Sequence, residues 1–130
     1  MFGFHLQEKT QMETMVSKAK QKGTAAETAV VRYLQDHGFP HAERRALHGS
    51  ADKGDVTGLG PVVLEVKNCQ RLELSAWLRE LEAEIVNAKA NTGSLVVKRK
   101  GTQDAAGWYA ILPFGDLVEL LLDAGYGAGR

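Results

Sequence analysis

Three ionisable side chains, Asp55, Glu65 and Lys67, have the types and spacing that phosphoryl chemistry requires. The segment Lys53–Lys67 reads KGDVTGLGPVVLEVK, with one acid before a glycine turn and two charged residues inside the apolar run after it. Residues i and i+2 of a strand point to the same face, so Glu65 and Lys67 are expected to project together. Two carboxylates and one ammonium in a small volume suit metal-dependent phosphodiester hydrolysis, in which the acids hold a divalent cation beside the attacking water.

The turn Gly58-Leu59-Gly60-Pro61 must fold the chain back if Asp55 is to reach the charged pair. Its glycines and proline favour a tight reversal between two short strands. The sequence therefore predicts a hairpin of strands over 55–59 and 62–68. Its face opposite Glu65 and Lys67 carries Val62, Leu64 and Val66.

A helix is predicted from Lys22 to His37, ended by Gly38. Glu27 shares its apolar stripe with Val30, Val31 and Leu34, which turns this acid toward the core. The other predicted elements are a strand over 41–47, a helix over 75–91 with Ser75 as N-cap and Gly93 beyond its end, strands over 94–99 and 108–112, and a helix that follows Asp116.

The helix over 75–91 has a clear apolar face. Its core residues are predicted to be Leu74, Trp77, Leu78, Leu81, Ile85 and Ala88, while Arg79, Glu80 and Glu84 are predicted to lie outside. The element order is then α-β-β-β-α-β-β-α. This order predicts an α/β single domain, with a central mixed β-sheet flanked by helices.

The composition fits one domain, because 130 residues with 44% apolar and 25% charged side chains can build one core. Residues 17–130 are assigned to the domain, and 1–16 to an N-terminal tail or an extra helix. Sixteen basic and sixteen acidic residues cancel, which argues against a polycation that coats nucleic acid but allows a local basic groove. The single cysteine, Cys69, excludes an internal disulfide and is expected to be a small structural residue. This lone cysteine fits a reducing, cytoplasmic setting. The sequence has neither an apolar run of membrane length nor the long apolar core of a signal peptide.

The motifs together resemble the PD-(D/E)-x-K nuclease superfamily, and most closely its archaeal-type and phage Holliday-junction resolvases. The resemblance covers roughly residues 18–100 and implies a restriction-endonuclease-like fold. Gly54 stands where the family name has proline. The matching pieces are Lys22-Gly23 followed by Glu27, Tyr33-Leu34, His37-Gly38-Phe39, Arg44-Arg45, Gly49-Ser50, Asp55 and Glu65-Val66-Lys67.

The resemblance implies a catalytic set of Glu27, Asp55, Glu65 and Lys67. Asp55, Glu65 and the Val66 carbonyl would hold Mg²⁺ or Mn²⁺. Lys67 would orient or help deprotonate the water and stabilise charge at phosphorus. Glu27 would bind a second metal or position water. No organic cofactor is implied.

The implied partner is DNA, as four-way junctions or other branched structures recognised by shape and backbone charge. The expected DNA contacts come from Arg44, Arg45, Ser50, Lys53 and Gln70, and only one of the two arginines can face the DNA from a strand. A homodimer would place two active sites across one junction. The setting would be the cytoplasm of a prokaryotic, archaeal or phage-infected host cell.

Each of these residues also has a simpler explanation. Asp55 could be a surface acid beside a turn, Glu65 and Lys67 a surface ion pair, and Glu27 a first-turn acid favoured by the helix dipole. Two other functions stay open: a restriction- or repair-type nuclease of the same superfamily acting on duplex DNA, and a non-catalytic DNA-binding subunit of the same fold.

Overall fold

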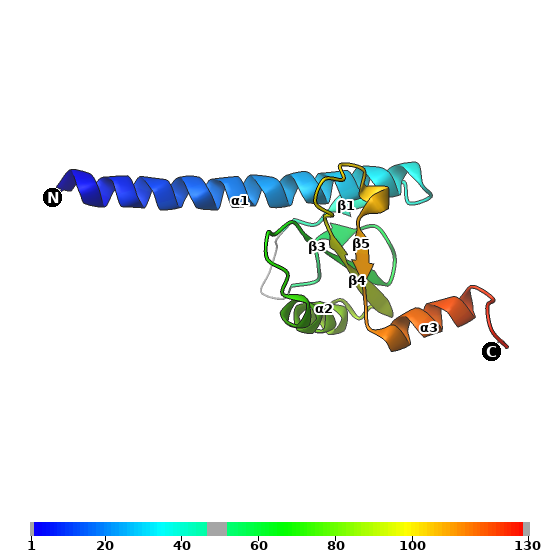
Figure 1. The fold of residues 1–130 in the computed structure, drawn as a ribbon. Coiled ribbons are helices and arrows are strands. Elements are labelled where there is room, and N and C mark those ends of the chain that lie inside the picture. The colour runs from blue at the N-terminus through cyan, green and yellow to red at the C-terminus, as the bar shows by residue number, and fades with distance from the viewer. Residues whose placement is uncertain (1, 47–51, 129–130) are drawn as a thin grey trace.

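The computed structural model describes residues 2–46 and 52–128 (Figure 1). Within them the helices are α1 (Phe2–Asp36), α2 (Leu74–Ala88) and α3 (Phe114–Asp123). The strands are β1 (Glu43–Arg44), β2 (Val56–Thr57), β3 (Val62–Lys67), β4 (Thr92–Val97) and β5 (Tyr109–Ile111), and a short 3₁₀ helix, η1 (Ala105–Gly107), precedes β5. Apart from η1, the order is the predicted one.

The strands form two sheets rather than one. β3 pairs in parallel with β4, and β4 pairs antiparallel with β5, which makes a mixed sheet. β2 pairs with β1 instead of β3, so the predicted hairpin ladder is absent from the described strands. The turn still reverses the chain, because the Asp55 N–H donates to the Leu64 carbonyl at 2.9 Å and Gly58 and Gly60 both take positive φ.

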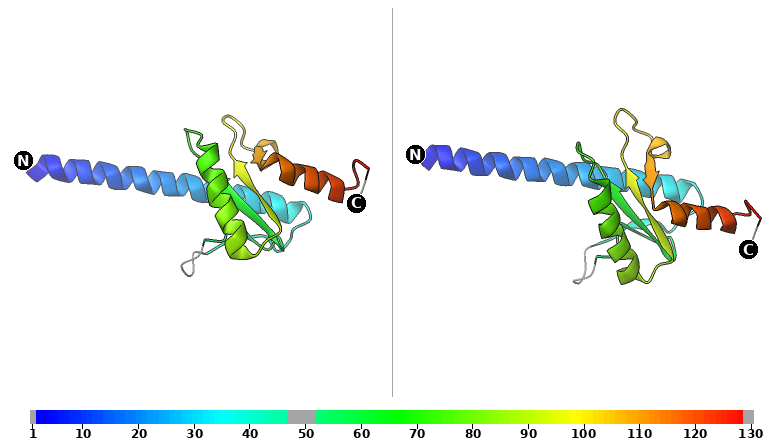
Figure 2. Two further views of the ribbon diagram at one scale, coloured as in Figure 1. Left: turned by 90° about the horizontal axis from the view of Figure 1, so that it is seen from below. Right: turned by 60° about the horizontal axis from the view of Figure 1, so that its bottom comes forward.

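Helices cover both faces of the mixed sheet, with the C-terminal half of α1 on one side and α2 on the other (Figures 1 and 2). Alternate side chains of β3 enter the two resulting cores. Val66 packs with Ala26 and Val30 of α1, whereas Val63 packs with Trp77 and Leu81 of α2. The α/β class with a mixed sheet flanked by helices is thus confirmed.

α1 is much longer than the predicted helix. It begins at Phe2 rather than Lys22 and continues without a break past residue 16, so its N-terminal half extends beyond the sheet (Figure 1). No proline interrupts this stretch, which explains why helix propagates through it. Among the described residues, no helix is both long and apolar enough to cross a membrane.

Several predicted boundaries shift. α2 has Glu73 rather than Ser75 at its N-cap, and Pro113 precedes α3, leaving Asp116 in its first turn. Gly93 does not end a helix, because α2 closes at Lys89 and Gly93 lies within β4. A Cβ on Gly93 would lie 2.6 Å from the Val63 carbonyl oxygen, so glycine permits this close approach of the two strands.

Candidate functional site

β3 turns Glu65 and Lys67 toward α2, as the strand period predicts. The Lys67 ammonium lies 3.3 Å from Oε1 of Glu65 and 3.1 Å from Oε2 of Glu80. Glu65 is only 4% exposed, so the surface-pair explanation is wrong for this residue. Burial lowers the pKa of Lys67, but the two carboxylates more than offset it and raise the pKa above its usual value. Lys67 is therefore a fixed ammonium.

Asp55 is held between β1 and β3 by its backbone and side chain. Its carbonyl accepts from the Arg45 N–H at 2.9 Å, and its Oδ2 accepts from the Val66 N–H at 2.7 Å. Burial, and then the charge of Glu65, raise the pKa of Asp55 to about 7 even though the Val66 N–H lowers it. Asp55 thus lies close to Glu65, one member of the Glu65–Lys67 pair.

Glu27 approaches the same region from α1. Its charge also raises the pKa of Asp55, while its Oε2 lies 2.9 Å from Nε of Arg44. The first-turn explanation for Glu27 is wrong, because α1 begins far upstream at Phe2. Arg44 of β1 thus forms an ion pair with Glu27 of α1, one of the predicted catalytic acids.

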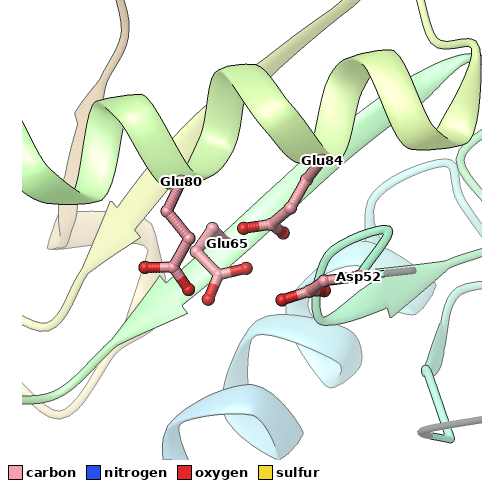
Figure 3. Close-up of side chains that lie close together, drawn as sticks. All are labelled: Asp52, Glu65, Glu80 and Glu84. Atoms are coloured by element: carbon pink, nitrogen blue, oxygen red, sulfur yellow. The ribbon is translucent and has the colours of Figure 1, made fainter. Parts of the chain in front are cut away.

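Two acids of α2 join the site against the sequence prediction. Glu84, predicted to lie outside, is 1% exposed, and Glu80 is half-buried. Together with Asp52 and Glu65 they place carboxylate oxygens within 4.8 Å of one another (Figure 3). The signal was in the spacing, because Glu84 follows Trp77 by two helical turns and therefore falls on the core stripe.

Buried oxygens in this cluster receive no hydrogen bond. Within the described part of the chain, both carboxylate oxygens of Glu84 and Oε2 of Glu65 lack a partner. Burial raises the pKa of both carboxyls, and neighbouring Glu84 raises the pKa of Glu65 further. Only a proton or a cation can satisfy such oxygens, and an all-oxygen donor set suits a hard divalent cation. The residues present therefore fit a Mg²⁺ or Mn²⁺ ion.

Gly54 fits the loop that carries Asp52 against β3. It has a φ of 95°, and a Cβ there would lie 2.6 Å from Cγ1 of Val63 and 3.3 Å from Oε2 of Glu84. Proline, fixed near −65°, cannot adopt this φ. The Gly54 N–H donates to Oδ1 of Asp52 at 2.9 Å, and Nδ2 of Asn87 donates to the Asp52 carbonyl at 2.8 Å. The loop is thereby fastened to α2.

The predicted DNA contacts are scattered. Arg44 pairs with Glu27, Arg45 buries an Nε that has no partner among the described residues, and Lys53 and Gln70 are exposed. Ser50 lies outside the described residues. Cys69, expected to be structural, is exposed.

A basic turn follows β4 directly beside Lys67. The Lys98 N–H donates to the Lys67 carbonyl at 2.9 Å, so the turn begins next to the backbone of Lys67. The Lys98 ammonium lies 5.9 Å from the centre of the Trp108 ring, and the Arg99 guanidinium 6.0 Å from that of Tyr109. The two rings thus hold cations of this turn in place.

No protein-family model matches this chain, and searches of curated proteins and of solved structures give no match either.

Proposed function

We propose that the protein is a metal-dependent DNA endonuclease of the PD-(D/E)-x-K type. The observation that carries this proposal is that Glu65 lies beside Lys67 and close to Asp55, residues that the motif names in this order. Asp55 is fixed by the Val66 N–H at 2.7 Å, and Lys67 is fixed by Glu65 at 3.3 Å. A buried acid and its paired ammonium are costly to place in a core, so their presence on one strand supports a functional role.

The roles follow from the surroundings of each group. Asp55, Glu65 and the Val66 carbonyl would hold Mg²⁺ or Mn²⁺. When bound, the ion neutralises the scissile phosphate and acidifies a coordinated water. Lys67, whose pKa is raised, stays protonated, which suits stabilising phosphate charge and orienting water better than removing a proton. Glu27, held by Arg44, faces Asp55 and would position water.

DNA would bind across the basic turn Lys98–Lys100 and across β1, which carries Arg44. The turn Lys98–Lys100 starts beside Lys67, and the side chains of Lys53 and Gln70 are exposed. Contacts of this kind bind phosphates rather than reading bases, which supports selection of DNA by shape. We propose four-way junctions or branched DNA as the substrate.

A homodimer is part of this proposal, because a junction has two strands to cut. Two apolar surfaces support it. The projecting part of α1 exposes Met12, Met15 and Val16 at 67–69%, on the stripe that continues to Ala26 and Val30. α3 exposes Phe114, Leu117, Val118, Leu120 and Leu121 at 37–78%.

Charge makes these two surfaces complementary. Residues 8–22 hold four lysines and two glutamates, whereas α3 holds three acids and no lysine or arginine. We therefore propose that α1 of one copy packs on α3 of a second copy, and the reverse, in a twofold arrangement.

The deciding experiment compares cleavage of a synthetic four-way junction with that of a matched linear duplex in Mg²⁺. Wild type should nick the junction at paired symmetric positions, and Asp55→Asn or Glu65→Gln should abolish cleavage while junction binding survives. Cutting of both substrates at equal rates would point to a restriction- or repair-type enzyme. Binding without cutting in Mg²⁺ and Mn²⁺ would leave a non-catalytic DNA-binding subunit.

A further inference from the structure

We propose that α2 supplies a second divalent-cation position, formed by Glu84, Glu80 and Asp52 and sharing Glu65 with the position assigned to Asp55. The second position follows from the geometry of α2 and of the loop that carries Asp52. Only the first position rests on the proposed function. None of the three added residues belongs to the Asp-Glu-x-Lys motif.

Unsatisfied buried oxygens point to a ligand at this place. Glu84 is 1% exposed, and neither of its carboxylate oxygens has a partner among the described residues. Leaving a buried carboxylate without a donor is costly, so it persists where something supplies positive charge. Figure 3 shows Glu84 reaching from α2 toward Glu65 and Asp52.

The arrangement has the dimensions and donor type of a cation site. One oxygen from each of Asp52, Glu65, Glu80 and Glu84 lies within 4.8 Å of the others. Oxygens that surround one Mg²⁺, Mn²⁺ or Ca²⁺ at about 2.0–2.6 Å are separated by distances of this order. The four carboxylates come from a loop, a strand and a helix, so tertiary structure has gathered them.

The surrounding contacts hold these donors in place without satisfying them. Asn87 and Gly54 fasten the Asp52 loop, at 2.8 and 2.9 Å. Lys67 contacts Oε1 of Glu65 and both oxygens of Glu80, but not Oε2 of Glu65 or the oxygens of Glu84. Lys67 thus contacts two of the four carboxylates, and the oxygens that it leaves are those that a cation would take.

Asp55 stands apart from this group. Its Oδ2 accepts the Val66 N–H, and it lies outside the set whose oxygens share the 4.8 Å spacing. Glu65 is the residue common to both groups, because it raises the pKa of Asp55 and also belongs to the α2 cluster. Two cation positions would therefore lie on either side of Glu65.

The test is the stoichiometry of Mn²⁺ binding to the full chain without DNA. The electron-spin resonance signal of unbound Mn²⁺ measures it. Wild type should bind two ions per chain. Glu84→Gln and Glu80→Gln should each weaken one step by about tenfold or more, since loss of even an indirect contact has that effect. Glu82→Gln, at an exposed position of the same helix, is the matched control and should bind like wild type.

Because Glu80 is only half-buried, Glu80→Gln is the variant less prone to misfold. Circular dichroism of both variants checks that α2 is still helical. A single ion in wild type, or unchanged binding in both Glu84→Gln and Glu80→Gln, would overturn the second position in favour of a shared proton. Asp55→Asn should lose the other step and keep this one. If Asp55→Asn cleaves DNA normally while Glu84→Gln still loses an ion, the nuclease site is wrong and the α2 position stands.

Discussion

At the scale of single residues, Lys67 shows how burial sets the chemistry of a group. Its ammonium touches Glu65 and Glu80 and lies 5.7 Å from the centre of the Trp77 ring. These contacts favour the charged form, so the residue neutralises acids when no substrate is bound. In the proposed nuclease, the same charge would be available to a phosphate group of the DNA.

Replacing Lys67 separates these two roles. Lys67→Ala should abolish cleavage, yet it should bind Mn²⁺ about fivefold more tightly because a competing positive charge is removed. Lys89→Ala, at an exposed lysine that ends α2 and has no assigned role, is the control and should keep cleavage. Weaker Mn²⁺ binding by Lys67→Ala would show that the ammonium organises the acids instead of competing with a cation.

Comparing Gly54 with Gly60 measures how much the close packing of Gly54 against Val63 contributes to stability. Both have positive φ, 95° and 70°, but a Cβ on Gly60 would meet nothing within 4 Å. Gly60→Ala should therefore cost only the backbone term, about 1–2 kcal/mol of unfolding free energy. Gly54→Ala should cost clearly more, because its methyl group also meets Val63. Urea unfolding measures both, and equal costs would mean that β3 yields to the methyl group.

At the scale of elements, α1 and α3 both leave large apolar side chains exposed. A helix gains most of its stability from packing, so a partner that covers the projecting part of α1 would stabilise it. The apolar stripe of that part continues the face that packs on the sheet. The second copy proposed above would cover it.

A charge on that stripe tests the dimer. Met15→Glu and Leu120→Glu should each convert a dimer to a monomer in sedimentation equilibrium, because each buries a charge in the proposed contact. Thr14→Glu adds the same charge on the opposite side of α1 and should stay dimeric. A wild type that is monomeric at cleavage concentrations would contradict the interface.

At the scale of the whole molecule, the fold concentrates acids between β3 and α2. Burial raises the pKa of Glu65, Glu84 and Asp55, the last to about 7. In the unfolded chain these groups titrate near 4. The folded state therefore binds more protons between these values, and stability is fully present below about pH 4 and lost as pH rises through the folded pKa.

Without a divalent ion, the melting temperature should fall as pH rises from about 5 to 8. Mg²⁺ at about a hundred times its dissociation constant should restore about 2.7 kcal/mol at pH 8 and much less at pH 5, where protons occupy the acids. Calorimetry with EDTA and with Mg²⁺ measures this. A pH-independent melting temperature without metal would argue against buried acids at the centre.

The sequence by itself determined the order of elements, the α/β class and the shared face of Glu65 and Lys67, because local periodicity fixes these. It also placed Asp55 near that pair, since the glycine turn is a local signal. It failed at the start of α1 and at the helix caps, where competing local preferences are nearly equal in free energy.

Only the tertiary structure decided the pairing of β2 with β1, the ion pair of Glu27 with Arg44 and the inward position of Glu84. Charge alone assigned Glu84 to solvent, but helical spacing put it on the core stripe, and packing of α2 on β3 then buried it. A buried acid is expensive in isolation. Whether it is tolerated depends on the charges that other segments bring to it, which no local pattern specifies.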